Sequence, residues 1–204
     1  MPMQEKVNSF VIHFVTSNQG KIKTLGNLFR NRGRPDVEVE GTKLDLIEPQ
    51  ADVVSEVSLS KARQAYGLLK KSVLVEDGGL AIEALRGFPG VYSKYVSQTL
   101  GATGIVKLMA GVPNRSARFV STATYIGENG QERQFPREGG EVSIANEVSD
   151  IESPLAWSPL WRVIRIDRYQ KVMSEMTREE INEYYSDGKS SLDKFADWFL
   201  ENIE

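Results

Sequence analysis

Residues 72–80 constrain the fold most, because a short apolar run there meets two carboxylates and two glycines. The run has the composition of a buried strand, and Glu76 and Asp77 follow it without a break. A strand that ends here would deliver both acidic side chains to the mouth of a sheet. Gly78 and Gly79 would let a phosphate or a metal approach the main chain. A plain strand followed by an acidic turn is the alternative, and this stretch alone favours neither.

A second strand leads into a polar segment upstream. Residues 10–15 are apolar and predict a buried strand. The strand runs into three good helix N-caps, Thr16, Ser17 and Asn18. Apolar residues then recur at helical spacing, which predicts strand, loop and helix. The start of that helix presents free N–H groups, and Lys21 lies within its first turn, so an anion is favoured there. Only Gly20 and Lys21 match the P-loop pattern GxxxxGK[ST], which therefore gives no support.

The composition narrows the classes of function. We expect the 204 residues to form one domain, 1–204, with a single well-buried core. The formal net charge of -3 argues against a nucleic-acid partner, although a local pocket for a phosphorylated ligand is compatible with it. The absence of cysteine excludes disulfides, thiol nucleophiles and thiolate zinc sites, and it suits a reducing cytoplasm. No apolar stretch reaches the roughly 20 residues of a membrane span, so we expect a soluble protein.

The rest of the chain predicts further strands and helices. We expect a short strand and two helices over residues 37–40, 54–70 and 105–109. From residue 115 the hydrophobic period changes to two, which predicts an antiparallel insertion of three strands over residues 117–126, 131–135 and 141–148. Closing helices are expected over residues 177–186 and 192–203. Together these elements predict a mixed α/β fold with its site at strand ends.

Three side chains have both a structural and a functional interpretation. His13, the only histidine, lies inside a predicted strand without neighbouring ligands, so we expect it to be structural. Trp157 and Trp161 lie in a proline-rich segment. They could fill the core or form a platform for a planar ligand, and we expect the core.

The polar residues at the predicted strand ends suit phosphate chemistry. Three carboxylates, those of Glu48, Glu76 and Asp77, are oxygen ligands of the kind that magnesium prefers. Lys21 and Lys61 could hold several phosphates. The sequence offers no serine–histidine or cysteine–histidine pair. These residues therefore predict metal-assisted displacement at phosphorus, with a carboxylate orienting or deprotonating water.

Five motifs carry a resemblance to a known family. The motifs T-x-N-x-x-K, D-L-x-E and E-x-x-x-x-K-A are matched by Thr16, Asn18 and Lys21, by Asp45, Leu46 and Glu48, and by Glu56, Lys61 and Ala62. The central D/E-D-S-G-L is matched by Glu76, Asp77, Gly79 and Leu80, with Gly78 in place of serine. The motif A-L-x-G-x-P-G-x-Y-S is matched by residues 84–93. Over nearly its whole length the chain resembles the inosine/xanthosine triphosphate pyrophosphatases, house-cleaning enzymes that convert non-standard purine nucleoside triphosphates to monophosphate and pyrophosphate.

The resemblance implies a fold, a cofactor and a set of site residues. It implies an elongated, two-lobed α/β molecule in which helices flank a central mixed sheet, with a cleft between the lobes and a homodimeric assembly in the cytoplasm. It implies a nucleoside triphosphate substrate and Mg²⁺, with Glu48, Asp77 and Glu76 on the metal side and Asp77 and Lys21 as catalytic residues. Substrate contacts are expected at Thr16, Ser17, Asn18, Lys21, Lys61, Gly78, Gly79, Ser93, Trp157, Asp187 and Lys189.

The second half departs from the family pattern. The family's G-F-G-Y/W-D-P-x-F aligns with residues 154–161, which keep the aromatic Trp157 but lack both glycines and the aspartate. The family's S-H-R, which reads the purine base, aligns with Tyr185, Ser186 and Asp187. A carboxylate at position 187 would accept from an exocyclic amine and repel a carbonyl, so we expect an altered base specificity. A non-catalytic nucleotide-binding or regulatory homologue is the alternative function.

Overall fold

Seven strands form one mixed sheet in the computed structural model, which describes residues 10–186 and 190–203. The strand order is β2-β1-β3-β4-β5-β6-β7. The strands are β1 (Phe10–Val15), β2 (Val37–Thr42), β3 (Val73–Ile82), β4 (Ser116–Ile126), β5 (Glu132–Ile144), β6 (Ile164–Ile166) and β7 (Lys171–Val172). β1 pairs in parallel with β2 and β3, and every later pair is antiparallel.

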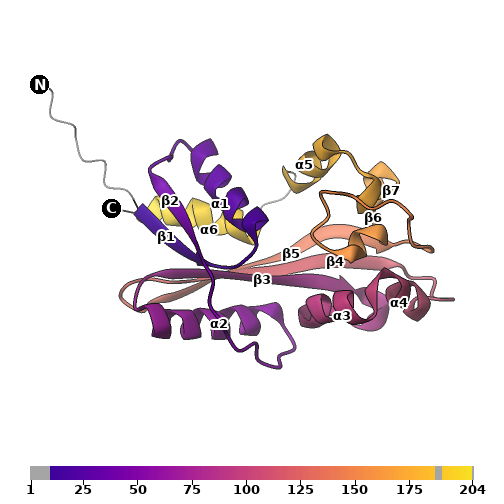
Figure 1. Ribbon diagram of the computed structural model, residues 1–204, viewed down its shortest axis with the longest axis horizontal. Coiled ribbons are helices and arrows are strands. Elements are labelled where there is room, and N and C mark those ends of the chain that lie inside the picture. Colours follow the sequence, from indigo (N-terminus) through magenta and orange to yellow (C-terminus); the bar gives the residue numbers. More distant parts are fainter. Residues whose placement is uncertain (1–9, 187–189, 204) are drawn as a thin grey trace, which may run out of the picture.

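Within the described residues, six α-helices flank this sheet (Figure 1). They are α1 (Gln19–Asn31), α2 (Val54–Leu69), α3 (Ser93–Thr99), α4 (Gly101–Leu108), α5 (Arg178–Ser186) and α6 (Ser191–Asn202). Short 3-10 helices include η1 (Glu83–Leu85), η2 (Gly90–Tyr92), η3 (Pro159–Arg162), η4 (Asp167–Tyr169) and η5 (Met173–Glu175). In the described part of the chain, no helix is both long and apolar enough to span a membrane.

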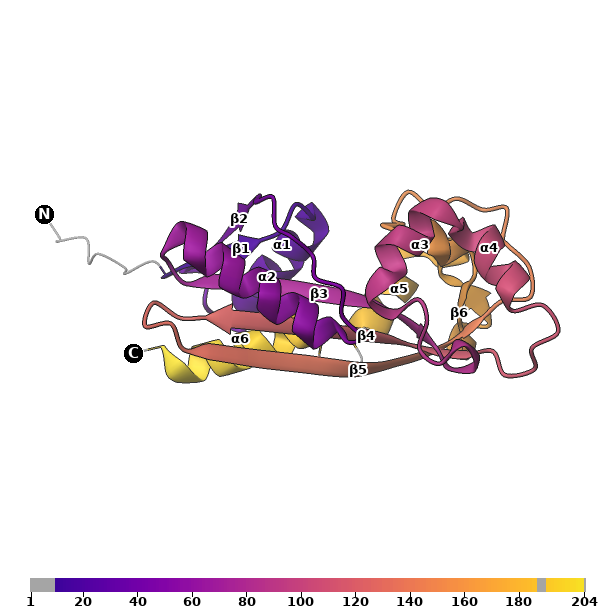
Figure 2. The ribbon, with the colours of Figure 1, turned by 90° about the horizontal axis from the view of Figure 1, so that it is seen from below.

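The long strands β3, β4 and β5 connect two groups of elements. Figure 2 shows these strands along the length of an elongated molecule, with β1, β2, α1, α2 and α6 around one end. The helices α3, α4 and α5 lie with β6 around the other end. The predicted α/β fold with a central mixed sheet flanked by helices is therefore confirmed. The cleft between two lobes stays a prediction.

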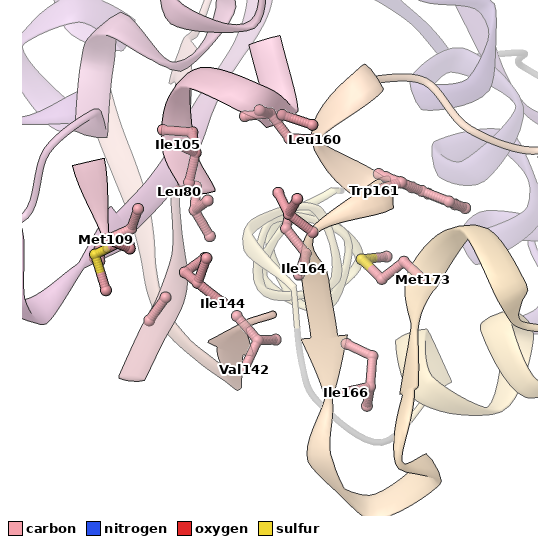
Figure 3. Close-up of a cluster of buried hydrophobic side chains, with 14 of the residues drawn as sticks. Leu80, Ile105, Met109, Val142, Ile144, Leu160, Trp161, Ile164, Ile166 and Met173 are labelled. Carbon is pink, nitrogen blue, oxygen red and sulfur yellow. The ribbon is translucent and has the colours of Figure 1, made fainter. Parts of the chain in front are cut away.

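Each end of the molecule has its own buried side chains. Around α1 and α6, Phe14, Phe29 and Phe195 are fully buried with Leu74 of β3. At the other end, Leu80 of β3 belongs to a cluster that gathers α4, β6 and η3, and Figure 3 shows these side chains around Ile164. A third cluster lies between α2 and the sheet. One strand, β3, contributes to all three clusters, so its central residues lie between two packed ends.

Two strand boundaries that were predicted at glycines differ from the structure. β3 was expected to end at Glu76 and Asp77, but its ladder with β4 continues from Val73 to Ile82. The predicted third strand over residues 141–148 was also wrong, because β5 is continuous over Glu132–Ile144. Two glycines of β5 fall where the register with β4 shifts, so they form a β-bulge and not a turn. The predicted insertion is therefore part of the main sheet.

Gly79 is required by close packing of β3 against η2. A Cβ at this position would lie 2.0 Å from the carbonyl oxygen of Gly90 and 2.8 Å from Ser93 Oγ. The hydroxyl of Ser93 donates to Gly90 O at 2.6 Å and accepts from the backbone N–H of Leu80 at 2.8 Å. It therefore ties η2 to the strand at the point where the two backbones approach.

Changing Gly79 to alanine is expected to lower the free energy of unfolding by about 1–3 kcal/mol, because the added methyl group forces the backbones apart. Urea unfolding followed by circular dichroism measures this loss. Gly67→Ala is the matched control, since a Cβ there meets nothing within 4 Å and alanine should stabilise α2 by about 0.5–1 kcal/mol. Equal stability of the two variants would contradict the close approach.

Candidate active site

The middle of β3 interrupts the buried core. Residues 73–75 and 80–82 of this strand are buried, whereas residues 76–79 are partly or fully accessible. Because successive side chains of a strand point to opposite faces, Glu76 and Asp77 cannot share one face of the sheet. The accessible stretch therefore presents one carboxylate to each face. Each carboxylate meets a lysine from a different helix.

Asp77 faces α2, where Lys61 joins it to Glu48. The ammonium of Lys61 donates to Asp77 Oδ2 at 3.0 Å and to Glu48 Oε1 at 2.9 Å. Burial lowers the pKa of Lys61, but the two carboxylates outweigh burial and the pKa is raised on balance. The hydrogen bond from Lys61 lowers the pKa of Glu48. This face therefore places the ammonium of Lys61 between two carboxylates.

Glu76 lies on the other face, with Lys21 and Ser191. The ammonium of Lys21 is 2.6 Å from Glu76 Oε2 and donates to the Glu76 carbonyl oxygen at 3.3 Å. The hydroxyl of Ser191, at the start of α6, donates to Glu76 Oε1 at 3.1 Å. The Glu76 side chain is only 11% exposed, while that of Lys21 is 34% exposed. The carboxylate is thus the buried partner and the ammonium the accessible one.

The loop between β1 and α1 places Lys21 beside this carboxylate. Asn18 caps α1 by accepting from the backbone N–H groups of Gly20 at 2.9 Å and Lys21 at 3.2 Å. Thr16 Oγ1 in turn accepts from the backbone N–H of Asn18 at 3.1 Å. Ser17 is exposed in the same loop. The predicted strand, loop and helix are confirmed, and the first turn of α1 is positioned beside the accessible part of β3.

The two glycines after Asp77 have different surroundings. Gly78 is exposed, and its backbone N–H donates to Asp77 Oδ1 at 2.9 Å. Gly79 packs against η2, as described above. Ser93, expected among the substrate contacts, uses its hydroxyl in that packing as both donor and acceptor. Of these residues, Gly78 has the backbone that a ligand could reach.

The structure separates the two tryptophans. Trp161 is 1% exposed and belongs to the core, whereas Trp157 is 61% exposed, so the expected core role is wrong for Trp157. The centroids of the two rings lie 6.0 Å apart, and the rings pack edge to face. Burial raises the pKa of Tyr185, and a hydrogen bond with Trp157 opposes that change. Trp157 thus offers an accessible aromatic face near the C-terminal end of α5. Asp187 and Lys189 lie outside the described residues.

The expected grouping of three carboxylates is not what the structure shows. Only Glu48 and Asp77 come together, because Glu76 projects from the opposite face of β3. Among the residues that the structure describes, no group of three or more acidic or histidine side chains could hold a metal ion. His13 Nδ1 lies 3.3 Å from Glu40 Oε2 on β2, and its structural role stays a prediction. A metal here would have two carboxylates from the protein and its other ligands from substrate or water.

Two serines of the site were missed from the sequence. Ser121 on β4 lies directly across from Gly78 in the ladder, and its hydroxyl donates to Ser191 Oγ at 3.0 Å. Ser191 follows Ser190, which caps α6 in a capping box with Asp193. The cap could have been recognised from the sequence. The contacts of these serines with Glu76 come from strand pairing and helix packing, which no local pattern reveals.

Comparison with known proteins identifies the family. The sequence profile of the Ham1 family matches residues 12–198. The chain belongs to the Ham1 family. The dITP/XTP pyrophosphatase of Thermococcus kodakarensis is 36% identical over 192 residues, which cover 94% of this chain and 98% of that protein. The corresponding protein of Methanopyrus kandleri is 35% identical over 93% and 96% of the two chains. The resemblance inferred from the motifs is confirmed.

A solved structure supports the fold. The structure of a HAM1 protein from Coxiella burnetii has a TM-score of 0.76 to this chain and is 20% identical to it. The match covers 94% of this chain and 99% of that one. At this identity the likeness concerns the fold alone. It indicates that the long strands and the two groups of elements around them are those of a Ham1 protein.

Proposed function

We propose that this chain is a nucleoside triphosphate pyrophosphohydrolase, which breaks the bond between the α- and β-phosphoryl groups and releases monophosphate and pyrophosphate. The observation that carries the proposal is the placement of two lysine–carboxylate sets, Lys61 with Asp77 and Lys21 with Glu76, at the one accessible stretch of β3. The named activity of the Ham1 relatives supports it.

Glu48 and Asp77 are the residues that would hold Mg²⁺. Their oxygen atoms already flank one cation, the ammonium of Lys61, at 2.9 and 3.0 Å. Two carboxylates also fit this ion, which commonly takes one or two of them and completes its shell with phosphates and water. When bound, the ion would supply Lewis-acid polarisation of the phosphoryl oxygens.

The other side chains of the proposed site have separate roles. Lys21, beside the positive end of the α1 dipole, would bind the phosphate chain. Asp77 would orient the attacking water and accept its proton as the new oxygen–phosphorus bond forms and pyrophosphate leaves. Lys61, once displaced from between the carboxylates, could neutralise the departing phosphates. Thr16, Ser17, Asn18 and Gly78 complete the proposed phosphate contacts, and Trp157 would provide a stacking face for the base.

The metal can be tested without turnover. Lys61→Met is expected to lower the melting temperature by a few degrees, because it leaves Glu48 and Asp77 without their cation. Millimolar Mg²⁺ should then raise the melting temperature of this variant more than that of the wild type, which must give up its ammonium first. Differential scanning calorimetry with and without the ion measures both effects. Lys71→Met, at an exposed position, is the control, and an equal response of all three proteins would count against this site.

Asp77→Asn is expected to lower kcat about 100-fold or more while the fold stays intact, because it removes the proton acceptor without changing the volume of the side chain. The measurement is pyrophosphate release from nucleoside triphosphates with Mg²⁺, together with circular dichroism. Asp150→Asn, at an exposed aspartate, should leave the rate unchanged. Release of orthophosphate alone would contradict the proposed reaction, and near-full activity of Asp77→Asn would remove this residue from the mechanism.

The preferred base is a separate part of the proposal. The names of the relatives assign dITP and XTP to those proteins. In this chain the carboxylate expected opposite the base, Asp187, cannot donate to a carbonyl group when ionised. We therefore expect triphosphates with an exocyclic amino group to have a higher kcat/KM than inosine or xanthosine triphosphate. Steady-state kinetics on the wild type and on Asp187→Arg measures this, and a wild-type preference for inosine triphosphate would refute it.

A non-catalytic nucleotide-binding homologue is the second candidate function. The observation that favours it is the loss of the family's base-reading residues. Thermal stabilisation by nucleoside triphosphates without any pyrophosphate release would support this alternative. The single domain, the homodimer, the cytoplasmic location and the lack of a nucleic-acid partner stay predictions.

A further inference from the structure

A chain of three hydrogen-bonded side chains ends at Lys21. The hydroxyl of Ser121 donates to Ser191 at 3.0 Å, Ser191 donates to Glu76 Oε1 at 3.1 Å, and Glu76 Oε2 lies 2.6 Å from the Lys21 ammonium. The two serine hydroxyls donate in the same direction, toward the Glu76 carboxylate, so their bonds polarise one another, and the Lys21 ammonium approaches that carboxylate from its other oxygen. The members of this chain come from β4, α6, β3 and α1. The chain therefore links β4, α6 and β3 to one accessible cation on α1.

The two oxygens of Glu76 have separate partners. This side chain is largely buried, so an oxygen without a donor would carry a desolvation cost. Ser191, which is itself 1% exposed, satisfies Oε1 and leaves only Oε2 for Lys21. The serine hydroxyl can do so because Ser121 supplies the bond that its own oxygen accepts. The geometry thus prevents both carboxylate oxygens from turning to the lysine.

The number of donors on Lys21 shows why the separate partners of the two Glu76 oxygens are important. An ammonium has three N–H donors, and this one donates to the Glu76 carbonyl oxygen and forms an ion pair with Glu76 Oε2 at 2.6 Å. Among the residues that the structure describes, this leaves a donor for a ligand beside the N-terminus of α1. If Oε1 lost its serine, it would become a competing acceptor for that donor. A substrate phosphate would then have to displace it.

The neighbouring glycine leaves room for this arrangement. Gly78 pairs with Ser121 across the ladder, and a Cβ at position 78 would come within 3.1 Å of the Ser121 Cβ and 3.0 Å of the Val120 carbonyl oxygen. A side chain at position 78 would therefore crowd the serine that supports Ser191. The absence of one keeps the path from Ser121 to Glu76 open.

We infer that Ser191, supported by Ser121, is a positioning residue for triphosphate binding: it holds the Glu76 carboxylate so that Lys21 keeps a free donor for the phosphate chain. The inference rests on the proposed function for the identity of the ligand. It assigns to the start of α6 a part in phosphate binding through two other side chains and without direct contact with substrate.

Equilibrium binding tests this role independently of turnover. Isothermal titration calorimetry with Mg²⁺ would compare adenosine triphosphate carrying a methylene bridge between its α- and β-phosphorus atoms with adenosine monophosphate. Ser191→Ala is expected to weaken binding of the triphosphate analogue about three- to tenfold, the size of one hydrogen bond, and to leave monophosphate binding unchanged. Ser191→Thr, which keeps the hydroxyl, should restore most of the affinity. Lys21→Ala is the reference variant and should lose at least as much.

A double-mutant cycle separates positioning from simple packing. Glu76→Gln replaces the competing oxygen with an amide, so Ser191→Ala should have little further effect in that background. Ser149→Ala is the matched control, because it removes another serine–glutamate hydrogen bond, 2.6 Å to Glu175, outside the site. Three results would each overturn the inference. Ser191→Ala could weaken monophosphate and triphosphate binding equally, or its loss of affinity could multiply with that of Glu76→Gln in the double variant. The third such result is an equal effect of Ser191→Ala and Ser149→Ala on triphosphate affinity.

The same experiment distinguishes this inference from the proposed function. The enzymatic proposal would be refuted if the wild-type protein binds the triphosphate analogue but releases no pyrophosphate from nucleoside triphosphates. The comparison of the serine variants would still test the inference in that case. A wild-type protein that binds neither nucleotide would overturn both. Pyrophosphate release with unchanged triphosphate affinity in Ser191→Ala would overturn the inference alone.

Discussion

The pleat of one central strand determines how the charged side chains of the candidate site are arranged. Two adjacent carboxylates, Glu76 and Asp77, must point to opposite faces of the sheet, so a different helix supplies the lysine for each. Lys21 comes from α1 on one face and Lys61 from α2 on the other. A proposed phosphate contact and a proposed metal contact are thereby separated by the thickness of a single strand. The site can exist only where both faces of β3 are accessible.

That access depends on how the core is divided. The long strands carry one set of buried side chains at each end of the molecule, and β3 belongs to both. Its middle residues are left between the packed ends, so polar groups there need not be fully desolvated. Ion pairs that are partly desolvated are weak evidence for stability, because the cost of desolvation offsets their attraction, and these pairs interrupt an otherwise apolar strand. The contribution of these ion pairs to the free energy of unfolding does not by itself explain why β3, α1 and α2 carry four charged side chains here.

The second half of the chain combines a kept fold with altered polar residues. The Ham1 profile matches residues 12–198, yet the segment before η3 and the end of α5 differ from the family motifs. Trp157 stays accessible, while Trp161 anchors the core. The proposed function thus assigns binding of phosphates and binding of the base to different elements. One can change while the sheet, and with it the lysine–carboxylate sets, stays the same.

The sequence by itself determined the local structure and the chemical inventory: the β1–α1 junction capped by Asn18, the main helices, the absence of thiol chemistry and the lysines and carboxylates of the site. Only the tertiary structure decided that β3 continues through its glycines and that Glu76 lies on the opposite face of the sheet from Asp77 and Glu48. It also brought Ser121 and Ser191 to Glu76. The reason is physical: capping and hydrophobic periodicity act between near neighbours in the chain. Strand register, close backbone approach and burial depend on residues far apart in sequence, such as Gly79 and Gly90.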